Sequence, residues 1–271
     1  MTRWAAMVAV LGVAAATAGS AQAVGPWPGL AAAVRSASGD VRYTATRSQG
    51  ATIVKRVAAG RAVASTRIAG AFGIPAVTSV GAAGGLSPDG RLLVLVEPPR
   101  YDGLRRESRF VVLATARLSR VATISLPGEF GFDAVSPDRR TLYLIQHVSQ
   151  RDLIRYVVRA YDLHAGKLLP GAIVDRREPD ERMRGYPVAR ASSPDGSWVY
   201  TLYTRDAGST RSFVHALNAA GRSAFCIDLP AWAGGEDVWN ARLELAGGVL
   251  RVRAPSGETV ARIDTQTLRL V

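Results

Sequence analysis

The chain of 271 residues has few of the side chains that usually carry covalent or metal chemistry. It has one cysteine, Cys226, so a disulfide within the chain is excluded. Its three histidines, His147, His164 and His215, show no HExxH or other paired metal-binding spacing. We therefore expect structural or exposed histidines, and a buried, unreactive Cys226 because its neighbours are apolar. The sequence predicts no metal ion and no cofactor.

Lysine is also scarce, because only Lys55 and Lys167 among the 34 Lys and Arg residues are lysines. The formal net charge is +12, but the cations are dispersed and form no run, which argues against nucleic-acid binding. Hydrophobic residues make up 48% and charged residues 21%, which excludes a disordered chain or a polytopic membrane protein. The charge excess predicts a salt-sensitive affinity for anionic surfaces.

The sequence has a long apolar stretch only near its start, from Trp4 to Ala16, after the single cation Arg3. Small residues at Ala21 and Ala23 follow it. This pattern predicts a secretory signal peptide over residues 1–23, and therefore a secreted or extracytoplasmic protein of the cell envelope. The alternative is an uncleaved segment that would be the protein's only contact with a membrane.

Three segments of the chain repeat one pattern, an apolar strand, a Ser-Pro-Asp turn and a second strand of alternating apolar residues. The segments are GGLSPDGRLLVLVEP, FDAVSPDRRTLYLIQHV and RASSPDGSWVYTLYT, with turn serines Ser87, Ser136 and Ser193. In such a turn Ser bonds the backbone ahead, Pro fixes φ, Asp favours the third position and Gly accepts a left-handed conformation. Each segment is therefore predicted to be a β-hairpin.

Two further strand-like runs follow each hairpin, and weaker copies of the unit begin near Ser38 and Ala246. The repeat period is close to fifty residues, and the predicted turn positions are Gly39, Gly90, Arg139, Gly196 and Gly247. Radial stacking of such sheets buries their apolar faces and leaves short edges. The sequence thus predicts an all-β fold, a β-propeller of about five four-stranded blades, as one domain over residues 24–271. A sixth blade, a β-sandwich and a solenoid are the alternatives.

The Ser-Pro-Asp hairpin is followed by an apolar strand that ends in Tyr161-Asp162-Leu163, and by a turn at Gly166. Over residues 84–228 this repeat resembles the bacterial propeller repeats of the YVTN/YncE-like and TolB-like kinds and, more loosely, WD repeats. The resemblance implies an exported propeller that binds proteins or small ligands. It carries over no catalytic residues, because the motif is a signature of the fold.

Aligning the repeats places Gly84, Asp133 and Arg190 three residues before each turn serine, on the innermost strand that lines the channel. We expect Asp133 and Arg190 to lie near each other, as a structural pair or as polar groups of a binding site. Tyr186, Trp198 and Trp239 are candidates for ligand stacking, or for aromatic packing between blades (Tyr186 and Trp239 being the stronger binding candidates).

A charged segment from Asp175 to Arg182 lengthens one repeat. Its carboxylates could bind calcium, since they are hard oxygen ligands, but the arginines between them compete. We favour a solvated loop of ion pairs. The acids concerned are Asp175, Glu178, Asp180 and Glu181.

No catalytic set is recognisable in the sequence. The predicted function is that of a monomeric binding or scaffold protein for a protein partner or an anionic envelope component. The alternative is a metal-assisted hydrolase or lactonase with its site at the central channel, which would require convergent carboxylates or histidines. Asp133 is the one obvious acidic candidate for such a site.

Overall fold

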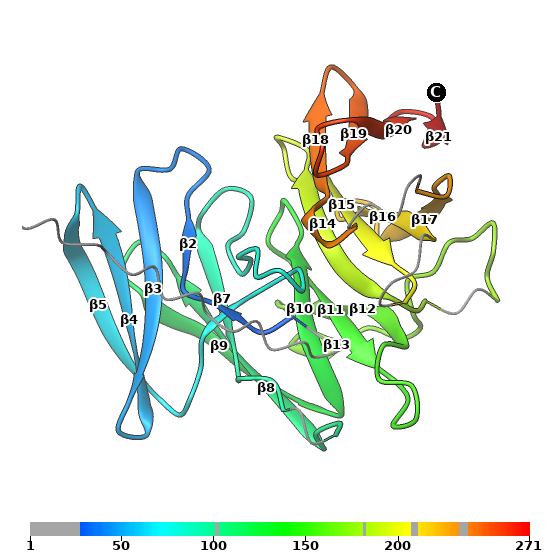
Figure 1. The fold of residues 1–271 in the computed structure, drawn as a ribbon. Coiled ribbons are helices and arrows are strands. Elements are labelled where there is room, and N and C mark those ends of the chain that lie inside the picture. The colour runs from blue at the N-terminus through cyan, green and yellow to red at the C-terminus, as the bar shows by residue number, and fades with distance from the viewer. Residues whose placement is uncertain (1–27, 101–102, 181–182, 207–210, 233–237) are drawn as a thin grey trace, which may run out of the picture.

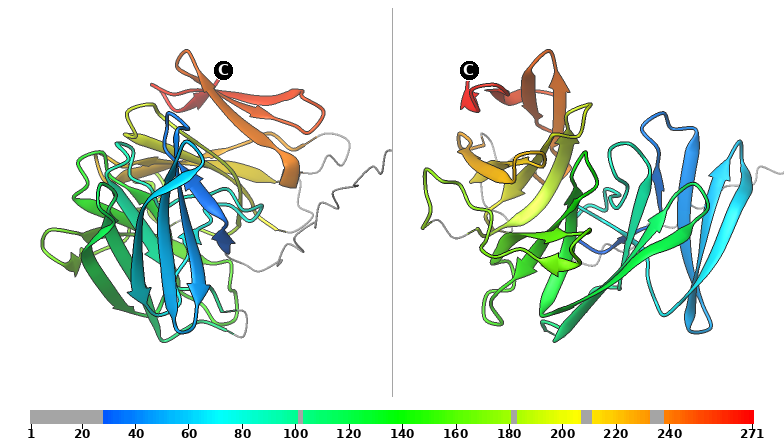
Figure 2. Two further views of the ribbon diagram at one scale, coloured as in Figure 1. Left: turned by 90° about the vertical axis from the view of Figure 1, so that its left-hand side faces the viewer. Right: turned by 180° about the vertical axis from the view of Figure 1, so that it is seen from behind.

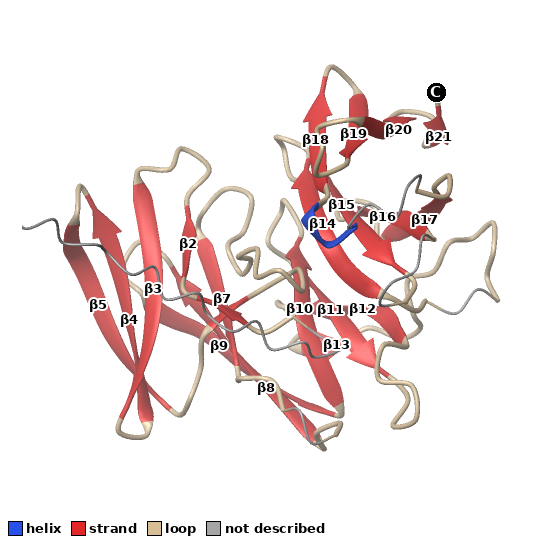
Figure 3. Cartoon of the chain, in the orientation of Figure 1, coloured by secondary structure: helices blue, strands red, loops and turns tan. Residues whose placement is uncertain are grey.

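A computed structural model describes residues 28–271, except 101–102, 181–182, 207–210 and 233–237. The described residues form strands and one 3₁₀ helix, η1 (Val238–Asn240), as Figure 3 shows. Among them, no helix has the length and apolar character needed to cross a membrane. The predicted signal peptide lies outside the described residues.

Five antiparallel sheets follow one another along the chain (Figure 1), and in each of them the strand order is the chain order. The first sheet consists of β2 (Ala33–Arg35), β3 (Val41–Ser48), β4 (Ala51–Ala58) and β5 (Arg61–Ala69). The second consists of β7 (Leu92–Val96), β8 (Glu107–Ala114) and β9 (Ser119–Pro127). The third consists of β10 (Glu129–Val135), β11 (Thr141–His147), β12 (Tyr156–Asp162) and β13 (Lys167–Leu168). The fourth consists of β14 (Tyr186–Ser192), β15 (Trp198–Thr204), β16 (Ser212–Asn218) and β17 (Ser223–Asp228). The fifth consists of β18 (Arg242–Ala246), β19 (Val249–Arg253), β20 (Thr259–Asp264) and β21 (Arg269–Leu270).

This succession of sheets is a β-propeller of five blades, as the sequence predicts. The second blade has three strands, because its innermost segment is reduced to a single bridge between Leu86 and Leu93. Gly85 precedes that bridge with φ +90°, and a Cβ on it would lie 2.5 Å from the Val94 carbonyl oxygen. The strand expected from Lys167 onward is shorter than predicted, since Pro170 soon follows it. A short pairing of β1 (Leu30–Ala31) with β6 (Ile74–Pro75) lies beside the first two blades.

The five predicted turn positions all adopt a left-handed backbone. The φ angles are +77° at Gly39, +70° at Gly90, +61° at Arg139, +70° at Gly196 and +58° at Gly247. Each residue connects the innermost segment of its blade to the next strand. The repeat phase read from the sequence is therefore confirmed.

The Ser-Pro-Asp turns hold themselves together as predicted. In the second blade the Ser87 hydroxyl donates to Asp89 Oδ1 at 2.7 Å and accepts from the Leu92 amide at 2.9 Å. The same bonds recur at Ser136 and Ser193.

Arg139 stands where the other turns have glycine. Its guanidinium lies 2.5 Å from Asp89 Oδ2 of the neighbouring blade. An ion pair between adjacent turns thus accompanies the left-handed strain at this position.

The hydrophobic core consists of four clusters, and each joins two neighbouring blades. Val54 packs in the same cluster as Leu93 between the first and second blades. Corresponding clusters join the second blade to the third, the third to the fourth and the fourth to the fifth. The blades therefore form an arc, which Figure 2 shows from two further sides.

A substitution at Gly196 tests how closely the turns of the second and fourth blades pack against each other. A Cβ at Gly196 would lie 2.2 Å from Pro88 Cγ, whereas a Cβ at Gly90, with the same φ, meets nothing within 4 Å. We expect Gly90→Ala to lower the free energy of unfolding by about 1–2 kcal/mol through left-handed strain. Gly196→Ala should cost a further ~1–3 kcal/mol through overpacking. Urea denaturation of both variants measures the difference, and equal losses would contradict the contact.

Candidate functional site

The innermost strands β10 and β14 and the segments near Pro75 and Leu86 surround a central channel. Two cavities lie along it, of about 60 Å³ and about 370 Å³. Val77, Phe132, Asp133 and Arg190 line both cavities. The larger cavity lies on the side of the Ser-Pro-Asp turns, because Pro88 and Ser193 line it.

Asp133 and Arg190 form an ion pair between the two cavities. One terminal guanidinium nitrogen of Arg190 bonds the Asp133 carboxylate, and the other donates to the Asp133 carbonyl oxygen at 2.6 Å. Arg190 Nε donates to Thr201 Oγ1 at 3.1 Å. The side chains are 3% and 13% exposed, so removal of one partner would leave a buried charge at a cost of about 3–5 kcal/mol. The expected proximity of the two residues is confirmed.

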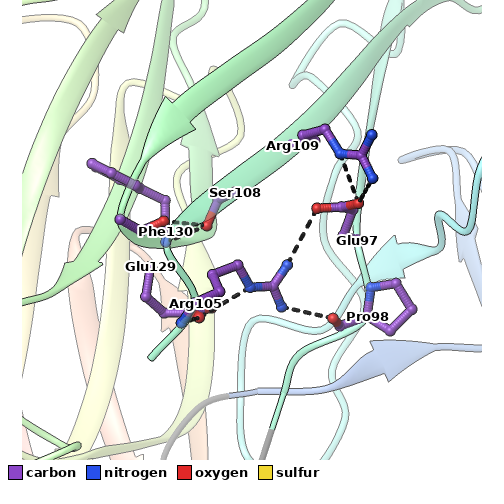
Figure 4. Close-up of polar contacts among 8 residues, drawn as sticks. Glu97, Pro98, Arg105, Ser108, Arg109, Glu129 and Phe130 are labelled. Atoms are coloured by element: carbon purple, nitrogen blue, oxygen red, sulfur yellow. Dashed lines mark hydrogen bonds and ion pairs between the residues drawn. The ribbon is translucent and has the colours of Figure 1, made fainter. Parts of the chain in front are cut away.

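A second polar cluster forms the wall of the smaller cavity (Figure 4). Buried Glu129, at the start of β10, accepts from the Arg105 amide at 2.8 Å and from Arg105 Nε at 3.0 Å. Arg105 also donates to the Pro98 carbonyl oxygen at 2.6 Å, and lies 3.5 Å from Glu97. Glu97 in turn accepts from Arg109 Nε at 2.9 Å. These bonds fix the loop that follows β7 against the third blade.

Two titratable groups of the smaller cavity disfavour their charged forms. Burial raises the pKa of Glu129, an effect that the hydrogen bonds and charge of Arg105 oppose. His147 is the cross-strand partner of Glu129, and its Nδ1 lies 2.9 Å from the Leu153 carbonyl oxygen. Burial lowers the pKa of His147 to about 4, so its imidazole is neutral at neutral pH.

Tyr156 and Tyr203 complete the lining of the smaller cavity. Their rings stack with centroids 5.4 Å apart. Burial raises the pKa of the Tyr156 hydroxyl well above its usual value. An interaction with the Tyr203 side chain adds to this shift. The hydroxyl is buried, and among the described residues it makes no hydrogen bond of normal geometry. It is therefore a donor at a cavity wall that an incoming polar group could satisfy.

The predicted stacking residues do not line either cavity, although Gly185 and Pro187 beside Tyr186 line the smaller one. Tyr186 makes an edge contact with Trp239 of η1, with ring centroids 5.5 Å apart. Trp198 stacks on Tyr200 at 6.1 Å. Trp198 and Trp239 pack against the core between the fourth and fifth blades. The structure thus brings Tyr186 and Trp239 together in packing between blades, and a binding role stays a prediction.

The charged loop differs from the solvated loop that we expected, because Asp175 is buried. It accepts from the Cys226 amide at 2.8 Å and from an Arg177 guanidinium nitrogen at 2.6 Å. These bonds lower the pKa of Asp175, although desolvation opposes the shift. Glu181 lies outside the described residues. Within the described part of the chain, no three His, Cys, Asp or Glu side chains gather as a metal site.

Cys226 is partly exposed, so the prediction of a buried thiol was wrong. It lies on β17, the last strand of its sheet, whose outer edge meets the Asp175 segment through a single bridge at Ala224 and through the Cys226 amide. Its Sγ lies 3.4 Å from Met183 Sδ. Of the histidines, His147 and His215 are buried and His164 is exposed in a turn.

Sequence reasoning missed Glu129, Arg105 and Tyr156. For Glu129 a signal existed: it stands seven residues before Ser136, as the candidate Tyr186 stands before Ser193. Arg105 comes from an irregular loop and Tyr156 from an ordinary apolar strand, so no motif marks either residue.

No protein-family model matches the sequence, and no curated protein matches it. Similar solved structures include the Dos1 propeller, with 8% identity, a TM-score of 0.48, and coverage of 87% of this chain and 55% of that chain. TolB from Acinetobacter baumannii has 12% identity and a TM-score of 0.42, with 87% and 53% covered. The chain spans about half the length of these two proteins. The likeness concerns the fold alone.

The two buried histidines make stability depend on pH. Burial lowers the pKa of both His147 and His215 from 6.5 to about 4. Between these values the unfolded chain binds protons that the folded chain does not, so stability falls as pH falls. Each histidine should contribute up to about 1.4 kcal/mol per pH unit. We expect His215→Gln to halve the histidine part of the slope between about pH 5 and about pH 6, measured by urea denaturation. An unchanged slope would contradict the assignment.

Proposed function

We propose that this chain is an exported binding protein that takes up a side chain of a protein partner in the smaller channel cavity. The observation that carries the proposal is the buried Tyr156 hydroxyl, which lines that cavity. Among the described residues it makes no hydrogen bond of normal geometry, although it interacts with Tyr203. A polar atom of the partner would satisfy it and recover the free energy of an unmade hydrogen bond.

The rest of the cavity fits such a role. Its other walls are mainly apolar, with Pro75, Phe130 and Pro187 among them, and the charged groups Glu129 and Arg190 are already held by partners. Binding sites commonly combine apolar walls with a few fixed polar groups. A volume of about 60 Å³ is small beside the roughly 150 Å³ that holds benzene, which favours one inserted side chain over a whole small molecule.

Hydrolysis is the second candidate. The observation that favours it is that Glu129 and His147, with pKa values displaced in opposite directions by burial, are cross-strand partners at one cavity. Displaced pKa values often mark acid–base sites. Against it, Arg105 holds the Glu129 carboxylate through two bonds, so a reaction would first require Glu129 to be released.

Export is the part of the proposal that rests on the sequence. If residues 1–23 are a signal peptide, expression of the full chain in a secreting host yields an extracytoplasmic protein that begins at Val24. The mass of the purified chain measures this. A chain that keeps Met1 and stays with the membrane fraction would support the uncleaved anchor.

Gly131 offers a direct test of the cavity. It lies on β10 and lines the smaller cavity, and a Cβ built on it meets nothing within 4 Å. Gly131→Leu should therefore fill the cavity with little strain. We expect the wild-type chain to recover a partner from envelope extracts, and the variant to bind that partner at least tenfold more weakly.

Val121→Leu is the matched control, because Val121 is 58% exposed on β9 and also gains side-chain volume. It should bind as the wild type does, and both variants should unfold at the same temperature as the wild type. Equal binding by Gly131→Leu, or no partner at all, would refute the proposal. Ester or lactone cleavage that Glu129→Gln abolishes would favour the second candidate.

A further inference from the structure

The arc of blades leaves one face of the first sheet and one face of the fifth without a neighbouring sheet. The four core clusters join consecutive blades, and within the described residues no cluster joins the fifth blade to the first. Figure 1 and the right-hand view of Figure 2 show the two terminal sheets apart. We call the faces turned away from the neighbouring blade the outer faces.

The outer face of the first sheet carries only positive charge. Strand alternation directs Val34, Tyr43 and Val54 toward the core. Their neighbours on the opposite side are exposed cations, namely Arg35, Arg42, Lys55 and Arg67. Strands β2–β5 contain no acidic residue, and no ion pair to any of the four cations is found in the described structure.

These four cations form a diagonal stripe. Arg35 lies opposite Arg42, Lys55 lies opposite Thr44, and Arg67 is opposite Ile53, which pairs with Thr46. Arg35 and Arg42 are therefore direct cross-strand neighbours, about 5 Å apart. From Arg42 to Lys55 and from Lys55 to Arg67, each step moves one strand across and two residues along, which corresponds to a spacing of about 8 Å. We call this set the first stripe. Its four closely spaced cations suit a ligand with repeated negative charges.

The outer face of the fifth sheet also carries arginines, but two acids share it, Glu244 opposite Arg251 and Asp264 opposite Arg269. Arg242 lies opposite Arg253 and Arg251 lies opposite Arg262, with Arg269 beyond them on β21. Like charges that face each other on a sheet are destabilising. Glu244 relieves one of these contacts, through an ion pair of 3.0 Å with Arg253. Such repulsion in the free protein favours an anion that would cover the face.

We propose that the first stripe binds an acidic polysaccharide, with the fifth-sheet arginines as a second contact of the same kind. Arginine suits this ligand, because its planar guanidinium pairs with carboxylates in two bonds. The hydroxyls of Thr44, Thr46 and Ser65 lie between the cations on the same face and can bond sugar hydroxyls. This surface is separate from the channel cavity and does not depend on the function proposed there.

The same residues disfavour two other occupants. A second copy of the chain would bring one cationic outer face against another, which like-charge repulsion opposes. A single-stranded nucleic acid would find no aromatic platform, because Tyr43 faces the core and β18–β21 contain no aromatic residue.

The test is binding of polygalacturonate to the mature chain, measured by calorimetry at low salt. We expect binding that weakens steeply as salt is added, and a loss of at least tenfold in affinity in the variant Arg42→Thr/Lys55→Thr/Arg67→Thr. Threonine keeps the strands, because it has a high β propensity. Thermal unfolding of the variant should match that of the wild type.

The matched control is Arg117→Thr/Arg120→Thr/Lys167→Thr, which removes three exposed cations from the second and third blades. It lowers the net charge equally and should change the affinity less than twofold. Equal losses in the two variants would show that only net charge matters and would overturn the proposal. So would the absence of binding, tighter binding of single-stranded DNA or polyphosphate than of polygalacturonate, or a dimer in light scattering that the stripe variant abolishes.

Discussion

A four-stranded sheet with two partly apolar faces cannot bury both within itself, and in this chain the neighbouring sheet supplies the cover. That constraint produces the arc. Each core cluster is shared by two blades, so no blade is an independent folding unit: Leu93 of the second blade packs with Val54 of the first, while Val94 of the same strand packs with Phe132 of the third. The innermost strands are thereby brought side by side, and the channel between them is a consequence of how the sheets cover one another.

The charged groups of the channel are paired because they are buried. Asp133, Glu129 and Arg190 have little exposed surface, so an isolated charge at any of these positions would be costly. Arg190 reaches across from β14 to Asp133 on β10, and Arg105 reaches from a loop of the second blade to Glu129. Each ion pair joins two blades, so the bonds that satisfy the charges also fix how adjacent blades sit. The Tyr156 hydroxyl takes no part in this pairing: in the described structure it interacts with Tyr203 but makes no hydrogen bond of normal geometry.

Local turn chemistry explains how much of this could be predicted. Ser-Pro-Asp turns are determined by residues within a few positions of each other, so the sequence predicts the hairpins and the blade phase. The structure adds that Arg139, which replaces the turn glycine, keeps the left-handed backbone. The contact between Asp133 and Arg190 followed because equivalent positions of adjacent repeats lie side by side. Arg105 could not be predicted in this way, because it belongs to a loop that no repeat constrains. The prediction of a buried Cys226 failed for another reason. Its sequence neighbours are apolar, but the exposure of its side chain depends on the position of β17 at the edge of the sheet.

The cations behind the net charge of +12 include two physically different groups, those paired in the channel and those exposed on the surface. Arg190 and Arg105 are held by carboxylates across blade boundaries, where burial makes each bond expensive to break. Arg42, Lys55 and Arg67 face solvent on a sheet without acids, where their stems cover the sheet and their charges stay wet. Pairing in the channel uses as many acids as cations and leaves the net charge unchanged. The excess therefore resides on surfaces, and the arc concentrates part of it on the two faces that no neighbouring blade covers.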